Sequence, residues 1–491
     1  MYTGYVKKIT ISKLFLYKHR FGIGYVLLFL MLCALLFLIP MLSPAGLSEA
    51  EMKSAVISHG QSIDTIMSGE IVDLPYHFVQ KMSIAAFGLN EYSIKLPSIV
   101  IGLLLGVLII LLLNRWFKNN VAIIASILTV LSAPFLFLAG NGTPLIMLVF
   151  WPTLLLWLGS KINGKKLAKT FYAFLFAVFL LASLFTPYMI YFAIFSVIYA
   201  LVHPHLRFMI RSLPKIPFII TSIAVLAVIG VMGYEIIKYP STLTELCFMS
   251  DFSWTAFFDN IKNAFLVFFS WSGNIDSIFL APMIGMASLI LAITGLISTT
   301  KGFFASRNSI ASIFIVFTTI ISGFNPDSAV LIILPFAILT AHGIRYVLEK
   351  WYGLFPENPY ARIFGLIPIS TFLGIMIVTS LTHYVFGYSY NPIVANQYQD
   401  DLELIYNEVQ RGTTILIPAG TINYDFYKIL EEQGDYKVTS NTPSTGDKED
   451  IKHIATLGLW PAKLPYDLSR IITSSKSTNS DRIYLYQDNQ E

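Results

Sequence analysis

The stretch PSIVIGLLLGVLIILLL, residues 97–113, determines the class of fold to which the chain belongs. It contains no charged residue, and its length suits a helix that crosses the hydrocarbon core of a bilayer, which takes roughly 17–25 apolar residues. Lipid offers the backbone no hydrogen-bond partner, so such a run is helical, whereas the strands of a membrane barrel alternate polar and apolar residues. Comparable runs recur along the chain. We therefore expect a polytopic α-helical membrane protein.

The composition of the whole chain excludes an ordinary soluble enzyme. Of its 491 residues, 55% are hydrophobic and 13% are charged, whereas a soluble domain carries about 25% charged residues. The net charge of +4 is small, and the two cysteines, Cys33 and Cys247, predict neither a disulfide nor a metal site. The positions of the charges are therefore more informative than their sum.

We predict about eleven membrane-spanning helices, each long enough to cross or nearly cross a bilayer. The first, residues 21–42, follows a basic N-terminus. It is too long for the apolar part of a signal sequence and lacks a small-residue cleavage site, so we expect it to be retained. Gly102 and Gly106 in the second span are expected to be small-residue packing positions. The other spans are 97–113, 121–139, 144–159, 171–185, 187–202, 217–233, 277–297, 309–321, 328–341 and 363–382.

The lysines and arginines predict the orientation of these helices, because such residues are enriched in cytoplasmic loops. The three short loops 140–143, 186 and 322–327, all on one side of the membrane in this scheme, contain none. We therefore expect a multi-pass protein of the cytoplasmic (plasma) membrane, with its N-terminus inside and its C-terminus outside. The loops on the other side contain Arg115, Lys118, Lys161, Lys165, Lys166, Lys169, Arg207, Arg211, Lys215, Lys301, Arg307, Arg345, Lys350 and Arg362.

The chain divides into a transmembrane domain, residues 1–390, and an extracytoplasmic tail, residues 391–491, where the composition changes abruptly. Within the first part, two outer loops are long, 43–96 and 234–276. The first contains two stretches that resemble helices lying along the membrane surface. The tail alternates helix and strand patterns, which predicts a small α/β domain. Its expected elements are a helix at 398–410, a strand at 413–418, a helix at 422–432, and strands at 436–439 and 482–486.

Two motifs in the first outer loop resemble the GT-C superfamily of membrane glycosyltransferases. They are GLSEAE, residues 46–51, directly after the first helix, and FGLNEYSIKLPS, residues 87–98, which opens the second. The resemblance is to the branch that includes the protein mannosyltransferases and the aminoarabinose transferase of lipid A, the glycosyltransferase 39-like proteins. Relatives have an acidic pair after the first helix, two interfacial helices and the motif F-G-x-x-E-x-x-x-R-L-P-S. The resemblance is good over residues 43–113 and weaker to about 240.

This resemblance implies a catalytic carboxylate in the first outer loop. The aspartate that begins the acidic pair in relatives is Ser48 here, so we expect Glu49 or Glu51 to replace it. Glu49 is the first choice because it adjoins Ser48, with an ordinary solvated carboxylate as the alternative for both residues. A carboxylate at this place can act as general base, orient the attacking group or hold a divalent metal. The resemblance leaves the metal requirement open.

The same loop is expected to bind the donor and the acceptor. Lys53, Lys81 and Lys95 are its only lysine or arginine residues, and they are the candidates for the donor phosphate. Lys95 stands where the family motif has arginine. His59, Asp73 and His77 are the remaining candidates for substrate contacts, with solvated histidines as the alternative reading.

The resemblance implies a transferase that moves a sugar from a polyprenyl-phosphate donor to a lipid, glycan or protein acceptor at the outer membrane face, with inversion at the anomeric carbon. No nucleic-acid partner is expected. One alternative is a non-catalytic protein of the same fold that binds a lipid-linked glycan or a partner enzyme. A transporter is a weaker alternative, because the predicted spans contain almost no charged residues of the kind that line transport pathways.

The topology can be tested directly. A phosphatase reporter fused after residue 491 is expected to be active, because the enzyme folds only outside the cytoplasm, whereas the same reporter fused after Lys118 should be inactive. Reporter activity measured in intact cells gives the answer. A cytoplasmic tail would also place the first outer loop in the cytoplasm and remove the basis for the expected site.

Overall fold

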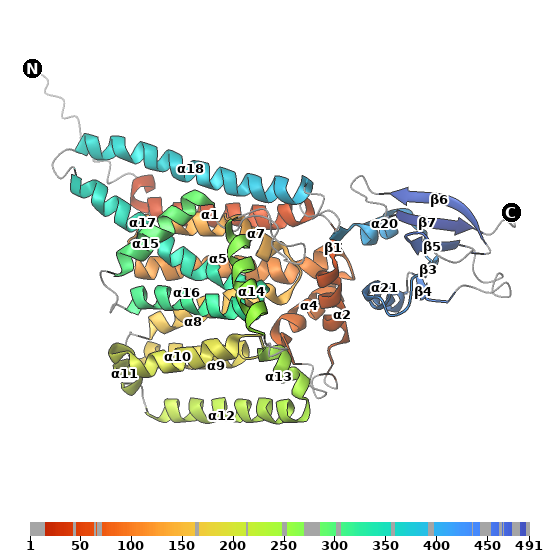
Figure 1. Ribbon diagram of the computed structural model, residues 1–491, viewed down its shortest axis with the longest axis horizontal. Coiled ribbons are helices and arrows are strands. Elements are labelled where there is room, and N and C mark those ends of the chain that lie inside the picture. Colours follow the sequence, from red (N-terminus) through yellow and green to blue (C-terminus); the bar gives the residue numbers. More distant parts are fainter. Residues whose placement is uncertain are drawn as a thin grey trace, which may run out of the picture.

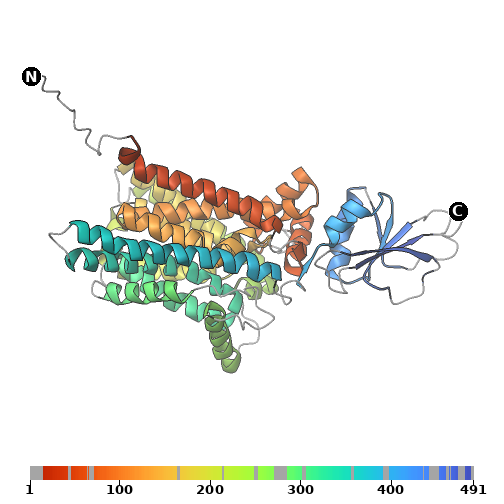
Figure 2. The same ribbon diagram turned by 90° about the horizontal axis from the view of Figure 1, so that it is seen from above.

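The computed structural model describes residues 15–42, 46–62, 65, 71–162, 166–212, 215–247, 253–269, 285–300, 306–354, 359–390, 397–434, 436–441, 453–460, 464, 466–473 and 482–487. The molecule is elongated, with a bundle of long helices at one end and a smaller α/β unit at the other (Figure 1). A quarter turn shows that two short helices of the first outer loop lie between these parts (Figure 2).

Most helices of the bundle run along one direction, side by side (Figures 1 and 2). The short helix α11 (Pro204–Arg211) lies at the end of the bundle farthest from the α/β unit. The other helices are α1 (Phe15–Leu42), α5 (Glu91–Trp116), α6 (Asn119–Val130), α7 (Ala133–Gly140), α8 (Met147–Lys161), α9 (Lys166–Ser183), α10 (Met189–Val202), α12 (Lys215–Lys238), α13 (Pro240–Cys247), α14 (Trp254–Phe269), α15 (Met286–Thr300), α16 (Ser306–Phe324), α17 (Ile333–Leu354) and α18 (Pro359–Tyr390), with 3₁₀ turns η2 (Pro144–Ile146) and η3 (Pro326–Ile332).

Each predicted span overlaps one of these helices, although the first part of the span 277–297 lies outside the described residues. By length and composition, four helices of the described chain are able to cross a membrane, or five if α6 and α7 form one span. The protein therefore has several apolar helices of the expected kind, and the count of eleven remains a prediction.

The predicted span 121–139 is not one continuous helix. It is bent by 59° between α6 and α7. Pro134 occupies the first turn of α7, where a proline is compatible with a helix start but not with continuation of the preceding helix. The periodicity of apolar residues continues through the bend, which is why sequence reasoning joined the two helices.

Small residues allow the bundle helices to approach one another closely. A Cβ added at Gly102 would lie 2.4 Å from the Cβ of Ala139, which explains the glycine predicted to pack here. The tightest crossing joins α15 and α17. There a Cβ at Gly295 would lie 2.0 Å from the carbonyl oxygen of Leu339, and a Cβ at Gly343 would lie 2.0 Å from that of Leu291. The two backbones therefore touch directly, as small residues permit in membrane bundles.

The α/β unit contains a five-stranded mixed sheet in the order β4-β3-β5-β7-β6. Strand β3 pairs in parallel with β4 and β5, and β7 pairs antiparallel with β5 and β6. Sequence analysis missed β5 and β6, and it assigned residues 398–399 to a helix although they form strand β2. The elements are β2 (Tyr398–Gln399), α20 (Asp401–Glu408), β3 (Thr414–Leu416), α21 (Ile422–Glu432), β4 (Lys437–Thr439), β5 (His453–Leu457), β6 (Asp467–Thr473) and β7 (Arg482–Gln487).

The α/β unit is attached to the first outer loop. Strand β1 (Leu47–Ser48) pairs antiparallel with β2, with Ser48 opposite Tyr398. The Tyr406 hydroxyl donates to the Leu89 carbonyl oxygen at 2.8 Å. One buried apolar cluster contains side chains from α2 (Glu49–Gly60), α4 (Leu74–Phe87), α20 and α21. The loop helices and the tail therefore share a core.

The crossing of α15 and α17 gives a stability prediction. Gly343→Ala is expected to destabilise the protein by about 1–3 kcal/mol, because the added methyl group overlaps backbone atoms and the helices must separate. Gly230→Ala in α12 is the matched control, since a Cβ there meets nothing within 4 Å and alanine favours helix. Thermal unfolding in detergent measures both. Equal Tm values for the two variants would contradict the close approach.

Candidate active site

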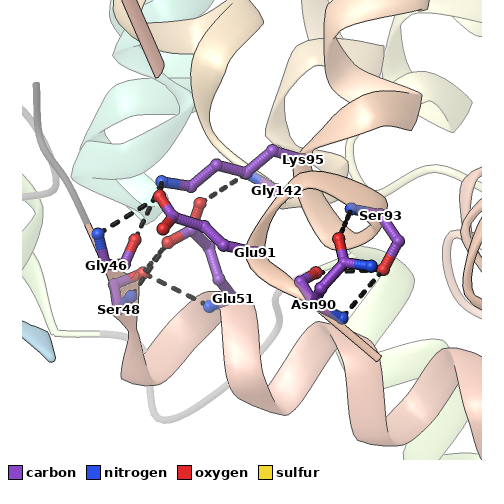
Figure 3. A network of polar contacts seen from close by, with 8 residues as sticks. All are labelled: Gly46, Ser48, Glu51, Asn90, Glu91, Ser93, Lys95 and Gly142. Atoms are coloured by element: carbon purple, nitrogen blue, oxygen red, sulfur yellow. Dashed lines mark hydrogen bonds and ion pairs between the residues drawn. The ribbon is translucent and has the colours of Figure 1, made fainter. Parts of the chain in front are cut away.

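Ser48 begins the helix in which the catalytic acids are expected. It is the N-cap of α2, and its hydroxyl accepts a hydrogen bond from the Glu51 N–H at 3.3 Å. The Glu51 carboxylate reaches back and accepts from the Ser48 N–H at 2.8 Å (Figure 3). This is a capping box, in which a serine and a glutamate three residues later satisfy two free N–H groups of the helix start. Ser48 therefore has a structural role in place of the family aspartate.

Both oxygens of the Glu51 carboxylate are in use. Besides its bond to the Ser48 N–H, Oε2 accepts from the Ser48 hydroxyl at 3.1 Å, and Oε1 accepts from the Gly142 N–H at 2.7 Å. The residue is fully buried. The capping box thus places a carboxylate beside the Ser48 side chain, where the family has its aspartate, but this carboxylate also joins α2 to the loop that follows α7.

The motif at the start of α5 forms a second polar cluster beside the first (Figure 3). Lys95 is buried, and its Nζ donates to the Glu91 carboxylate at 2.7 Å and to the Gly46 carbonyl oxygen at 2.8 Å. The Gly46 N–H donates back to Glu91 at 3.1 Å. Because a buried ammonium group needs a partner, this pairing explains why the motif has an acid four residues before the cation. Lys95 therefore holds the start of the outer loop against α5.

His77 belongs to a buried network of neutral groups. Its Nδ1 lies 2.8 Å from the Ser58 hydroxyl, which donates to Gln80 Oε1 at 2.6 Å. A hydroxyl has a single proton, so His77 must be the donor in its contact with Ser58. Burial lowers the pKa of His77 to about 4, so the ring is uncharged at neutral pH. Gln80 Nε2 then donates to the carbonyl oxygens of Ile94 and Gly142, each at 3.0 Å.

Asp73 differs from the other carboxylates that the structure describes in this loop, because one of its oxygens is buried without a partner among the described residues. It precedes α4, and its N–H donates to the Phe185 carbonyl oxygen at 2.7 Å. The residue is 9% exposed, and Oδ1 has no hydrogen-bond partner in the described part of the chain. Burial raises the pKa of Asp73 to about 8, against the opposing effect of a hydrogen bond with the Thr186 side chain. The Thr186 hydroxyl also accepts from Trp151 Nε1 at 3.0 Å.

The backbone is strained at this same place. Among the described non-glycine residues, positive φ values occur only at Asp73 (51°) and Tyr188 (64°). Such a conformation costs about 1–3 kcal/mol and is found preferentially at functional sites. Tyr188 follows Thr186 by two residues, and its side chain lies beside Asn325. The start of α4 and the loop between α9 and α10 therefore form one constrained polar junction.

Tyr76 links this junction to Glu51. Its hydroxyl lies 2.8 Å from the Ser98 hydroxyl, and the side chain is fully buried. Burial raises the pKa of Tyr76, a hydrogen bond with Ser98 opposes this, and the nearby Glu51 and Asp73 carboxylates raise it further. Both carboxyl groups consequently lie near this tyrosine of α4.

The remaining sequence candidates lie nearer the surface. Glu49 and Lys53 are exposed on α2. His59 Nε2 lies 2.8 Å from Glu432 in α21, and so faces the tail. Lys81 donates to the carbonyl oxygens of His59 and Gln61. The structure thus gathers Glu51, Asp73, His77 and Lys95 in the interior and separates them from Glu49 and Lys53.

Sequence reasoning missed several groups of this region. Gly142 contributes its backbone N–H and carbonyl oxygen, and the residue type does not predict such backbone contacts. Thr186 precedes a proline, and this pair predicts a turn. It does not predict the contact between Thr186 and Asp73. The Asp400 side chain lies close to Gly46, although the two are far apart in the sequence. Within the described ranges, no group of three or more histidine, cysteine, aspartate or glutamate residues is arranged to hold a metal ion.

Comparison with known proteins shows a partial family match and a shared fold. The family of dolichyl-phosphate-mannose-protein mannosyltransferases matches residues 74–234. The structure of ArnT from Cupriavidus metallidurans bound to undecaprenyl phosphate is 13% identical, with a TM-score of 0.54 over 95% of this chain and 98% of that one. The oligosaccharyltransferase of Archaeoglobus fulgidus tethered with an acceptor peptide is 11% identical, with a TM-score of 0.51 over 90% of this chain and 69% of that one. No curated protein matches the sequence.

The solved structures share the fold of this chain, and the family match covers the second interfacial helix and the spans that follow it. The chain therefore has the fold of these membrane glycosyltransferases, and residues 74–234 are similar in sequence to the mannosyltransferase family.

The buried carboxyl group of Asp73 gives a prediction that does not depend on activity. Its pKa is raised from 3.8 to about 8, so the folded state binds this proton more tightly than the unfolded state. The resulting stability is present below about pH 4 and is lost as the pH rises through about 8. Wild-type Tm should therefore fall over this range, and the fall should be smaller in Asp73→Asn. Exposed Asp425→Asn should behave as wild type, and parallel curves for all three proteins would contradict the prediction.

Proposed function

We propose that this protein transfers a sugar from a polyprenyl-phosphate donor to a lipid, glycan or protein acceptor at the outer face of the cytoplasmic membrane. The observation that carries the proposal is the pair of buried carboxyl groups, Glu51 and Asp73, near Tyr76 at the end of the bundle covered by α2, α4 and the tail. Relatives were crystallised with undecaprenyl phosphate and with an acceptor peptide, which supports both kinds of partner.

Asp73 is the carboxylate best suited to act as the general base. Its Oδ1 has unused hydrogen-bonding capacity within the described residues, whereas both oxygens of Glu51 are engaged. A base works best when its pKa is close to the operating pH, and burial brings the pKa of Asp73 to about 8. In the proposed reaction, Asp73 takes the proton from the acceptor hydroxyl as its oxygen attacks the anomeric carbon. The bond from that carbon to the phosphate oxygen breaks, and polyprenyl phosphate leaves with the electron pair.

The other candidates have supporting roles in this proposal. Lys53 is exposed on α2, and we assign it the lipid phosphate. The amino groups of Lys81 and Lys95 instead donate to protein oxygens. His77 and Glu51 hold the second interfacial helix and the loop after α7 in place. Glu49 is solvated and approaches the acceptor only from the surface.

The proposal that Asp73 matters more for catalysis than Glu49 gives an activity prediction. Asp73→Asn should lower kcat by about 10²–10⁴-fold, the loss expected when a general base is removed. Glu49→Gln should change kcat by less than about tenfold, because its carboxylate is exposed. Transfer from a pool of polyprenyl-phosphate sugars, measured with purified protein in lipid, distinguishes them. The wild-type rate should also rise with pH up to about 8. A large loss of kcat in Glu49→Gln, with kcat of Asp73→Asn unchanged, would contradict this proposal and would favour Glu49 as the catalytic carboxylate.

A second function is favoured by one observation. Ser48 replaces the family aspartate and is used as a helix cap, which suits a protein that has kept the fold to bind a lipid-linked glycan or a partner enzyme. Absence of transfer by the wild-type protein with every donor, together with retained binding of polyprenyl phosphate, would support this function instead.

A further inference from the structure

Part of the bundle end farthest from the tail carries positive charge without negative charge. The short helix α11 lies there, between the end of α10 and the start of α12 (Figure 1). Residues 92–234, which span most of the chain from α5 to α12, contain ten lysine and arginine residues and no aspartate or glutamate. A surface whose charges have one sign attracts ligands of the opposite sign. This part of the molecule is therefore suited to an anionic partner.

One turn brings cations from three helices together. The Lys169 ammonium group of α9 donates a hydrogen bond to the hydroxyl of Ser212, the residue that follows α11. Arg211 is the last residue of α11 and Lys215 is the first of α12, so both lie within three residues of Ser212. Helix α9 also packs against α12. Lys169, Arg211 and Lys215 are therefore neighbours at this turn.

Helix α11 adds a fourth cation and an apolar side chain. Arg207 and Arg211 are four residues apart, so they lie on the same face of the helix, and both are exposed. Phe208 lies beside them and is 70% exposed. The described residues provide no carboxylate partner for Arg207, Arg211 or Lys215. We call Lys169, Arg207, Arg211 and Lys215 the cationic cluster.

Apolar side chains continue from the cationic cluster along the outside of α10. Ile198, Leu201 and Val202 are 55%, 61% and 67% exposed. In a membrane, exposed apolar side chains contact acyl chains, whereas lysine and arginine extend toward the headgroups. A soluble anion would meet only the charges of this surface. A lipid with a negative headgroup would contact both the cationic cluster and the apolar side chains next to it.

Aromatic side chains place the cationic cluster at the level of the lipid headgroups. Tryptophan and tyrosine are enriched where the hydrocarbon core meets water. The ring centroids of Trp157 in α8 and Tyr172 in α9 are 6.3 Å apart, and Lys161 Nζ lies 5.7 Å from the Trp157 centroid. Lys169 precedes Tyr172 by three residues, which is about one helical turn. The ammonium group of Lys169 therefore lies close to this aromatic pair, at the depth of a phosphate group.

The cationic cluster differs from other cations that are expected on the same side of the membrane. In α17, Arg345 Nε donates to the Glu349 carboxylate at 2.8 Å, so its charge is balanced within the helix. Lys350 Nζ lies 5.8 Å from the centroid of the Tyr346 ring. An excess of lysine and arginine on the cytoplasmic side is general among membrane proteins. The lack of any carboxylate in residues 92–234 goes beyond that pattern and favours a negative headgroup over a neutral one.

We propose that the cationic cluster binds the headgroup of an anionic phospholipid in the leaflet away from the tail, which is expected to be the cytoplasmic one. The phosphate oxygens accept hydrogen bonds from the cluster, and the acyl chains lie along α10. Arg207 and Arg211 contribute most, because a guanidinium group can form two parallel hydrogen bonds with a phosphate. The proposal is independent of sugar transfer, since α2 and α4 lie at the opposite end of the bundle.

Native mass spectrometry of the full-length protein in detergent measures this binding directly. Phosphatidylglycerol and phosphatidylcholine with identical acyl chains are the probes, because they differ in headgroup charge. Phosphatidylglycerol is expected to bind about tenfold more tightly, equivalent to 1.4 kcal/mol. The double variant Arg207→Gln/Arg211→Gln should lose this preference and keep the wild-type affinity for phosphatidylcholine. Arg345→Gln/Lys350→Gln is the matched control, because it removes the same charge outside the cationic cluster and should bind both lipids as the wild type does.

Charge and fold are separated by a conservative variant. Arg207→Lys/Arg211→Lys should retain most of the preference for phosphatidylglycerol, since lysine also binds phosphate as a point charge. Equal affinities of the wild type for the two lipids would overturn the proposal, and so would equal losses in the two glutamine variants. Displacement of phosphatidylglycerol by glycerol 3-phosphate at the same concentration would assign the cationic cluster to a soluble phosphate compound and would also overturn it.

Discussion

The hydrogen bonds of the Glu51 carboxylate hold together the end of the bundle that carries the candidate site. They join the start of α2 to the loop after α7, and that loop in turn accepts from Gln80 of α4. Without the carboxylate, the Gly142 N–H would be buried with no partner, at a cost of about 1–3 kcal/mol. This one side chain therefore helps to position both α2 and α4, and with them Asp73 and His77.

Much of the fold could be predicted from the sequence because lipid imposes a simple rule on backbone polar groups. Apolar runs indicated the helices, and the motif of residues 87–98 lies within the segment, residues 74–234, that matches the mannosyltransferase family. The sequence did not predict the bend between α6 and α7, because apolar residues continue on both sides of it. In the tail, strands β5 and β6 were not predicted. Their residue composition resembles that of loops, and only the burial of their side chains in the folded protein distinguishes them.

The candidate site was predicted less completely, for reasons that the contacts explain. The sequence located the first outer loop and the acids and bases within it, but it ranked Glu49 above Asp73 by proximity to Ser48. Burial and an oxygen without a partner among the described residues distinguish Asp73 from Glu49. The contacts of Asp73 with Phe185 and Thr186, in the loop between α9 and α10, join residues more than a hundred positions apart. The Gly142 N–H is a backbone group, so the residue type does not predict its contact with Glu51. The positive φ of Tyr188 is equally unpredictable, because tyrosine rarely adopts it.

The apolar core that α2 and α4 share with the tail limits how this protein can be recombined with its relatives. Leu47, Met52 and Leu89 pack in one cluster with Ile405 and Phe426, and strand β1 pairs with β2. A tail transplanted from a protein of the same fold would replace one half of this core and leave the native half without its matching side chains. Chimeras should therefore exchange residues 46–95 and 397–487 together, because these distant segments pack against each other as one structural unit.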